Sequence, residues 1–205
     1  MGRQDVKAFV GRQIRKIGAL PDNRRRAMLA DLRRGIGYAP GELPQLWGAF
    51  LEDMPEAFMG QKEASHEEWA VYIALTYYAM HRQGRDEDVN RDGQSIGMAV
   101  RELAQRTAAS GQDWTESSVI RRFNALVTAT DIREISHHMR GMIQLLRSAP
   151  DGTIPLDYPQ LAADLYDLQC DDPRYANIPA NVKLRWGQDL YRYSRKDASD
   201  ETEEK

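Results

Sequence analysis

The chain has 205 residues, 41% hydrophobic and 29% charged, which is typical of a folded globular protein and excludes a disordered or collagen-like chain. Its 28 basic and 31 acidic residues give a net charge of −3. The charges are segregated, because residues 1–40 carry ten Lys or Arg against three acids, and residues 41–70 carry one against seven. Nucleic-acid binding depends on the local field, so the net charge does not exclude it.

Cysteine usage and hydropathy indicate the compartment. The one cysteine, Cys170, excludes an internal disulfide and a cysteine-based zinc cluster, and it fits a reducing environment. The longest apolar stretch, residues 69–80, is too short to cross a bilayer, and no charged-then-apolar leader opens the chain. We therefore expect a soluble cytoplasmic protein without membrane contact.

Apolar residues recur at helical spacing along the chain, and the alternation typical of strands is rare. In chain order, the expected helices are 6–17, 22–36, 43–50, 66–82, 95–108, 115–129, 131–147, 157–169 and 179–195. Asp22, Thr115 and Asp131 are expected as N-caps, and Ser65 with Glu68 forms a capping box.

These elements predict an all-α protein made of two small helical bundles. The boundary is expected near residue 110, between an N-terminal bundle (1–110) that holds a basic helix and a C-terminal bundle (111–196). The acidic tail, residues 197–205, has the composition of a disordered segment.

The segment 131–147 has the clearest pattern. Its apolar residues follow 3–4 spacing and are expected to face a core: Ile132, Ile135, Met139, Met142, Ile143 and Leu146. A second stripe, which contains no acid, holds Arg133, His137, Arg140, Gln144 and Arg147. Three arginines over two heptads span roughly 21 Å at 1.5 Å per residue. That length covers several phosphates of a nucleic-acid backbone.

Arginine is also concentrated on two other expected helices. The predicted nucleic-acid-binding residues there are Arg24, Arg25, Arg26, Arg33 and Arg34 on one helix and Arg121 and Arg122 on another. A guanidinium group can bind two phosphate oxygens at once or stack on a base. Two other interpretations stay open at this point: a solvated or ion-paired face, since Asp131 and Glu134 lie near Arg133, and a surface for a protein partner.

Other candidate sites have weaker patterns. His137 and His138 are adjacent, so they cannot share a helix face as a two-histidine metal site requires. Asp164, Asp167 and Asp171 follow i, i+3, i+7 spacing and are expected to form a solvated acidic stripe rather than a metal site. Cys170 lacks a matching His or Asn and is expected to be structural. We expect no catalysis, no metal and no cofactor.

Several short motifs in collinear order resemble one protein family. They are Ile120 to Leu126 (IRRFNAL), His138 to Arg140 (HMR), Leu156 to Leu161 (LDYPQL) with Asp164 and Leu165, then Trp186 and Gly187 with Tyr191. Their order and loop lengths resemble the small subunit of the type I-E CRISPR surveillance complex, Cascade (the CasB family). The resemblance is densest over residues 119–193. Met98 departs from it, standing where a basic residue is expected.

The resemblance implies a non-catalytic, two-bundle protein of antiviral defence. It implies that two copies associate head to tail beside the backbone and large subunits of Cascade. There they would hold the target and displaced non-target DNA strands of the R-loop. Guide RNA is a further candidate partner. Base pairing would supply the sequence information, so the protein would supply fixed cations. The resemblance implies that the first candidates for contact with nucleic acid are Arg121, Arg122 and Arg140. The next candidates are Arg33, Arg34 and Arg101. The acidic segment 148–175 would meet basic surface on a neighbouring subunit.

Two other functions fit the same residues. One is a helical protein–protein adaptor whose arginines bind acidic surfaces. The other is a helix-turn-helix regulator built around the turn at 128–131, although the stripe on 131–147 lacks the Asn, Gln and Ser mixture expected for base readout. The dependence of binding on salt and on DNA sequence separates the three functions.

Overall fold

The structure is a computed structural model that describes residues 2–85 and 87–192. Its α-helices are α1 (Arg3–Ala19), α2 (Asp22–Arg34), α3 (Trp47–Phe50), α4 (His66–His81), α5 (Ile96–Thr107), α6 (Ser118–Thr128), α7 (Ile132–Arg147), α8 (Tyr158–Leu168) and α9 (Asn177–Tyr191). Short 3-10 helices are η1 (Pro44–Leu46), η2 (Glu56–Phe58), η3 (Trp114–Glu116) and η4 (Pro173–Tyr175). Within these residues the only β-pairing is one isolated bridge, so the all-α prediction is confirmed.

Two of the predicted helix caps are correct. Ser65 accepts from the backbone N–H of Glu68 and completes the capping box of α4, and Asp131 accepts from the first turn of α7. Asp22 is wrong as a cap, because Pro21 holds that position and Asp22 is already the first residue of α2. Thr115 is also wrong. Its hydroxyl and backbone N–H both donate to Asp113, which leaves Ser117 as the cap of α6.

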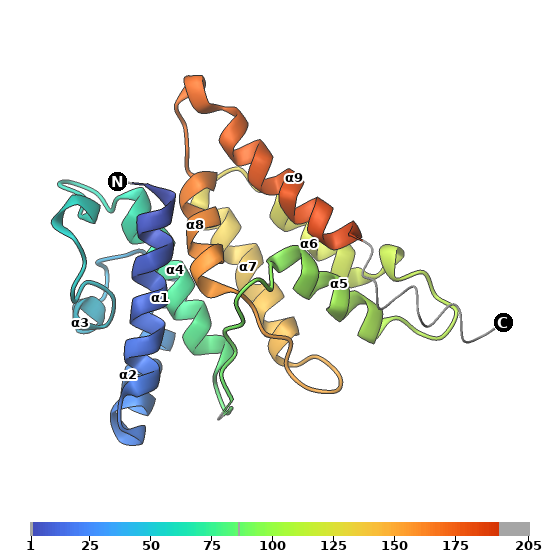
Figure 1. Cartoon of the computed structure of the whole chain (residues 1–205), viewed down its shortest axis with the longest axis horizontal. Helices are drawn as coiled ribbons and strands as arrows, with labels where there is room; N and C mark the ends of the chain where they lie inside the picture. The colour runs from blue at the N-terminus through green and yellow to red at the C-terminus, as the bar shows by residue number, and fades with distance from the viewer. Residues whose placement is uncertain (1, 86, 193–205) are drawn as a thin grey trace.

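Helix α4 lies at the centre of the molecule. Every residue from Ala70 to His81 is buried, so the helix has no exposed stripe over three turns. Helices α1, α2, α7 and α8 pack around it (Figure 1). A helix that is apolar around its whole circumference is stable only when neighbours cover every side. The surrounding helices are therefore amphipathic, with their apolar stripes turned inward.

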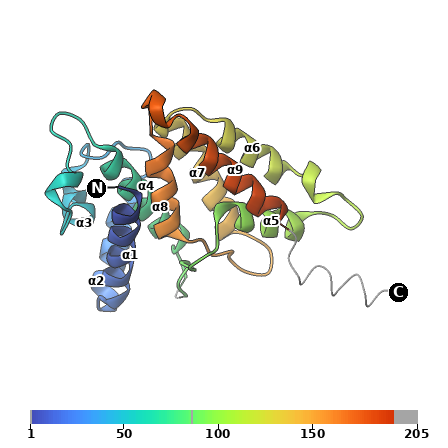
Figure 2. The ribbon, with the colours of Figure 1, turned by 45° about the horizontal axis from the view of Figure 1, so that its top comes forward.

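A second group of helices packs beside this centre. Helix α5 contacts α6, α7 and α9, and Figure 2 shows α9 lying across this group. The approach between α5 and α9 is close at Gly97. A Cβ on that residue would lie 2.1 Å from the carbonyl oxygen of Trp186. Only glycine permits this crossing without moving backbone.

Helix α8 joins the two groups, and Asp164 is its central polar residue. Its carboxylate accepts from Arg3 Nη2 at 2.9 Å, Gln160 Nε2 at 2.7 Å, Arg185 Nη2 at 2.5 Å and Trp186 Nε1 at 2.7 Å. The donors come from α1, α8 and α9. The expectation that Asp164 belongs to a solvated stripe is therefore wrong, because its side chain is buried and satisfied by four donors.

The buried side chains form one continuous apolar core that spans both halves of the chain. Helices α1 and α4 from the first half pack on α8 from the second, and the division near residue 110 stays a prediction. Among the described residues, no helix is long and apolar enough to cross a membrane. The predicted disordered tail, 197–205, lies outside the residues that the structure describes.

His81 is buried at the end of α4 and uses both ring nitrogens. Nδ1 lies 2.8 Å from the Tyr158 hydroxyl, and Nε2 lies 2.9 Å from Thr153 Oγ1. Burial lowers the pKa of His81 from 6.5 to about 4, and the positive charges of Arg85 and Arg147 add to this effect. The neutral ring is therefore part of the folded core.

The close crossing of α5 and α9 predicts opposite effects for two glycine substitutions. Gly97→Ala forces the two backbones apart and should lower the free energy of unfolding by about 1–3 kcal/mol or more. Gly187→Ala, in the interior of α9, meets nothing within 4 Å and should raise it by up to about 1 kcal/mol through helix propensity. Urea denaturation of both variants measures this. Equal changes in the free energy of unfolding for the two variants would contradict the close approach of α5 and α9 at Gly97.

Burial of neutral His81 predicts a loss of stability in acid. The unfolded chain binds a proton near pH 6.5, whereas folded His81 binds one only near pH 4, so stability falls as the pH drops through this window. Between pH 7.5 and 5 the wild type should lose about 2 kcal/mol more than His81→Gln, at 1.36 kcal/mol per pKa unit. Chemical denaturation at both pH values tests this. An equal loss in the two proteins would show that His81 is not responsible.

Candidate nucleic-acid interface

The predicted polar stripe of α7 lies on the surface. Its opposite face is buried, through Ile135, Met139, Met142, Ile143 and Leu146. Arg133, His137 and Arg140 are exposed, and Arg147 is half-buried at the end of the helix. The 3–4 apolar spacing forces this arrangement, because a helix that buries one stripe turns the other toward solvent.

The first turns of the α7 stripe border a cavity that contains aromatic rings. This aromatic cavity of about 220 Å³ is lined by Gly37, Tyr38, Ala39, Trp69, Tyr77, Arg133, Ser136, His137 and Arg140. The Arg133 guanidinium lies 5.3 Å from the centre of the Trp69 ring, within cation–π range. Tyr77 donates its hydroxyl to the Ser136 carbonyl at 2.6 Å, which fixes α4 to α7. The loop that follows α2 and the helices α4 and α7 thus contribute residues to one small surface.

The other end of the stripe meets a cavity lined by arginines. This basic cavity of about 400 Å³ is lined by Arg25, Arg26, Leu29, Arg33, Arg82, Gln83, Gly84 and Arg85. Arg147 reaches the same loop, donating to Gln83 Oε1 at 2.7 Å, while Arg85 donates to the Arg147 carbonyl at 2.7 Å. The C-terminal ends of α4 and α7 and one face of α2 therefore bring their cations together.

The electrostatics of the basic cavity favour an anion. Burial lowers the pKa of Arg33, and the positive charge of Arg147 lowers it further. Among the described residues, Arg33 and Arg147 donate only to neutral groups, the Ala79 carbonyl and the Gln83 amide. Like charges brought this close repel each other, and a bound phosphate would relieve the repulsion.

Some neighbouring arginines already have acidic partners. Arg25 pairs with Asp22, Arg34 with Asp31 at 2.8 Å, and Arg82 lies 3.6 Å from Asp88. These carboxylates are partly or largely exposed, so the pairs of Arg25 and Arg34 contribute little stability. Arg82 is held more firmly, because its side chain is only 10% exposed and also donates to the Tyr78 hydroxyl at 2.7 Å. The ion-paired interpretation left open by the sequence therefore applies to only part of the surface.

The two cavities lie along one run of cations, which we name the arginine track. It consists of Arg133, Arg140, Arg147, Arg33, Arg85, Arg82, Arg25 and Arg26. Helix α4 contacts both α2 and α7, which places the two arginine-bearing helices on either side of it (Figure 1). The predicted arginines of α7 and most of those of α2 are thereby joined into a common surface.

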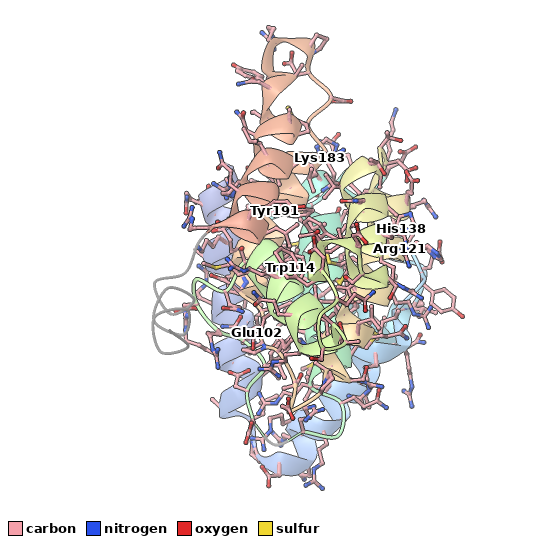
Figure 3. The ribbon with its side chains drawn as sticks, turned by 90° about the vertical axis from the view of Figure 1, so that its right-hand side faces the viewer. Glu102, Trp114, Arg121, His138, Lys183 and Tyr191 are labelled. Atoms are coloured by element: carbon pink, nitrogen blue, oxygen red, sulfur yellow. The ribbon has the colours of Figure 1, made fainter. Side chains whose placement is uncertain are left out.

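The remaining predicted arginines lie elsewhere. Arg24 is exposed near the start of α2. On α6, Arg121 is exposed and donates to the Glu116 carbonyl at 2.9 Å, and Arg122 is exposed with no polar partner among the described residues. Arg121 lies on the same side of the molecule as His138 of α7 (Figure 3). Helices α6 and α7 pack together, so these two arginines lie on a helix beside α7, outside the track.

Arg101 has a different environment from the other predicted residues. Its guanidinium lies 6.0 Å from the Trp114 ring centre, and it donates to the Arg192 carbonyl. Trp114 in turn lies beside Tyr191 of α9, with ring centres 5.9 Å apart (Figure 3). Arg101 therefore lies apart from the track, and its contacts hold α5, η3 and the end of α9 together.

Sequence reasoning missed two members of the track and a separate groove that is lined by both basic and acidic side chains. Arg82 and Arg85 border the polar loop after α4, where the excess of acids in residues 84–93 concealed them. The groove, about 850 Å³, lies between α1, α8 and α9 and includes Lys7, Arg12 and Arg15. Arg12 and Arg15 follow i, i+3 spacing on the polar side of α1, a signal that could have identified them.

The other candidate sites gain no support. Among the described residues, no group of three His, Cys, Asp or Glu side chains could hold a metal ion. The His137 and His138 rings are edge to face with centres 5.5 Å apart, and His138 Nε2 lies 3.9 Å from Glu134. Cys170 is half-buried with its Sγ 4.0 Å from the Tyr175 carbonyl.

Comparison with solved structures finds close matches in fold. CasB from Thermobifida fusca has a TM-score of 0.69 and 30% identity, covering 91% of this chain and 97% of its own. A CRISPR-associated protein of the Cse2 family from Thermus thermophilus has a TM-score of 0.62 and 24% identity, with 93% and 99% covered. CasB from M. ruber has a TM-score of 0.61 and 23% identity, with 95% and 97% covered.

Comparison with curated protein sequences gives no significant match. The model of one sequence family does match, over residues 28–191, and its description is CRISPR-associated protein Cse2. That range covers most of the chain and contains the arginine track, apart from Arg25 and Arg26, together with α6 and α9. Since the family model matches most of the chain and the fold agrees with it, the chain belongs to the CRISPR-associated Cse2 family, also called CasB, the small subunit of Cascade.

Proposed function

We propose that this chain is a non-catalytic small subunit that binds nucleic acid without sequence specificity through the arginine track. In this function it holds the target and displaced non-target DNA strands of the R-loop in the cytoplasm during antiviral defence. The observation that carries the proposal is the continuity of cations from Arg133, along α7, to the basic cavity. Exchange of DNA pairing for RNA–DNA pairing is nearly balanced, so modest backbone contacts can favour an open R-loop.

The composition of the track supports backbone contacts over base readout. Its charged groups are guanidinium groups, which match phosphate oxygens geometrically and carry no sequence information when they do so. Helix α7 packs on α4, α5 and α6, and most of its exposed residues belong to the polar stripe. A recognition helix reads base edges with side chains such as Asn, Gln and Ser, whereas the exposed stripe of α7 consists mainly of arginines. This composition disfavours the helix-turn-helix alternative.

The proposal includes protein partners. A second copy of the chain, arranged head to tail, and the backbone and large subunits of Cascade would extend the track beyond one molecule. The acidic segment 148–175 supplies surface carboxylates such as Asp171 and Asp151 for a basic neighbour, although Asp164 is occupied inside the fold. Guide RNA would meet the same cations, since phosphate contacts do not distinguish RNA from DNA.

Neutralising the track should weaken binding to single-stranded DNA and reduce its salt dependence. The triple variant Arg33→Gln/Arg140→Gln/Arg147→Gln removes three phosphate contacts, so the slope of log K against log salt should fall by about 2, at ~0.7 per contact. Affinity at low salt should fall by on the order of ten- to a hundredfold. Fluorescence anisotropy of a labelled oligonucleotide across a salt series measures both quantities.

A charge-matched control distinguishes the track from general positive charge. Lys62→Gln/Arg91→Gln/Arg174→Gln removes three exposed cations outside the track and should bind like the wild type. Equal losses in the two triple variants would show that only total charge matters. Absence of binding by the full-length wild type would favour the adaptor function instead.

Binding should also be independent of sequence. Oligonucleotides of equal length and different base order, free of secondary structure, should bind with Kd values within about twofold of one another, because phosphate contacts are the same in each. A specific reader typically loses about 1–3 kcal/mol per mismatched base pair. Competition titrations with unlabelled strands and duplexes measure this, and a strong preference for one duplex would indicate a regulator.

A further inference from the structure

The aromatic cavity differs chemically from the basic cavity at the other end of the track. The basic cavity is lined by five arginines and no aromatic ring. The aromatic cavity, in contrast, contains rings from Tyr38, Trp69 and Tyr77 together with Arg133 and Arg140. Phosphate alone would gain nothing from these rings, so the difference calls for a ligand with a flat apolar part as well as negative charge.

Two flat groups are available for stacking at this site. Tyr38 follows α2 and has 49% of its surface exposed, so its ring is accessible from the cavity that it lines. Arg133 lies over Trp69, and the outer face of a guanidinium in such a stack can receive a further planar group. Neither the half-exposed Tyr38 ring nor Arg133 is required to complete the core.

The charges of the cavity restrict the ligand further. Arg133 and Arg140 repel a cation, so the site cannot act as an aromatic cage for an ammonium group. A nucleotide satisfies both requirements, since its base stacks on a ring or guanidinium plane and its phosphate pairs with an arginine. We infer that the aromatic cavity binds one unstacked base of a single-stranded nucleic acid whose phosphates follow the arginine track.

This inference rests on the proposed function and specifies how a strand is held at one end of the track. Arg140 and Arg147 are seven residues apart on α7, or roughly 10 Å along the helix axis. The base in the aromatic cavity would therefore belong to the same strand whose phosphates reach the basic cavity. A free nucleotide offers the same base and phosphate but lacks the connected phosphates.

The test compares two strands that have the same number of phosphates. One is a labelled single-stranded 12-mer of thymidines, and the other is the corresponding strand of abasic sites. The full-length wild type should bind the thymidine strand roughly five- to a hundredfold more tightly, the range expected for stacking one base. Tyr38→Ala should remove most of this preference while leaving the affinity for the abasic strand and its salt slope unchanged.

Two variants serve as controls. Tyr38→Phe keeps the ring and should keep the preference. Tyr175→Ala removes a ring that is equally exposed, at 52%, and has its own arginine 5.7 Å away, but lies outside the cavity, so it should also keep the preference.

The possible outcomes separate this inference from the proposed function. Equal binding of the two strands by the wild type, or an equal loss for both strands in Tyr38→Ala, would overturn the base site and leave phosphate binding intact. Thymidine monophosphate that competes at the same concentration as the 12-mer would overturn the assignment to a strand. Failure of the wild type to bind either strand would overturn both the base site and the proposed function.

Discussion

The complete burial of α4 is the constraint on which the rest of the structure depends. Twelve consecutive buried residues require neighbours on every side, and α1, α2, α7 and α8 supply them. Because α2 and α7 are held on this helix, their outer faces are fixed relative to each other. The first turn of α4 presents Trp69 to one cavity, and the residue after its last turn, Arg82, borders the other. The apolar core thus positions the polar surface.

A protein of net negative charge can carry such a surface because several of its carboxylates are used in buried or helix-capping hydrogen bonds. Asp164 is enclosed by four donors, and Asp157 accepts from the backbone N–H groups of Gly93 and Gln160. Asp131 and Asp113 cap local structure in the same way. Each of these groups contributes to the charge count of the sequence without neutralising the track, so the local field differs in sign from the total.

Local patterns in the sequence predicted much of the helical structure and the exposed stripe of α7, because periodicity and capping depend on residues a few positions apart. They could not predict that Arg33 of α2 and Arg147 of α7 lie near each other, since that proximity depends on both helices packing against α4. The same limit explains why the burial of Asp164 was not predicted. The i, i+3, i+7 spacing shows which residues share a helix face, but only tertiary packing decides whether that face is covered. Arg82 and Arg85 were not predicted for a related reason, because the net charge of a loop does not show where each charged side chain lies.

Helix α9 is held mainly from its second turn onward, where Val182, Trp186 and Leu190 are buried and Gly97 lies against its backbone. Its first residues, Asn177, Ala180 and Asn181, are largely exposed, and that end projects past the other helices (Figure 1). Helix α9 is therefore supported mainly toward its C-terminal end. A rotation of α9 at the Gly97 crossing would move its projecting end further than the crossing itself, so the close approach that glycine permits fixes where that end lies.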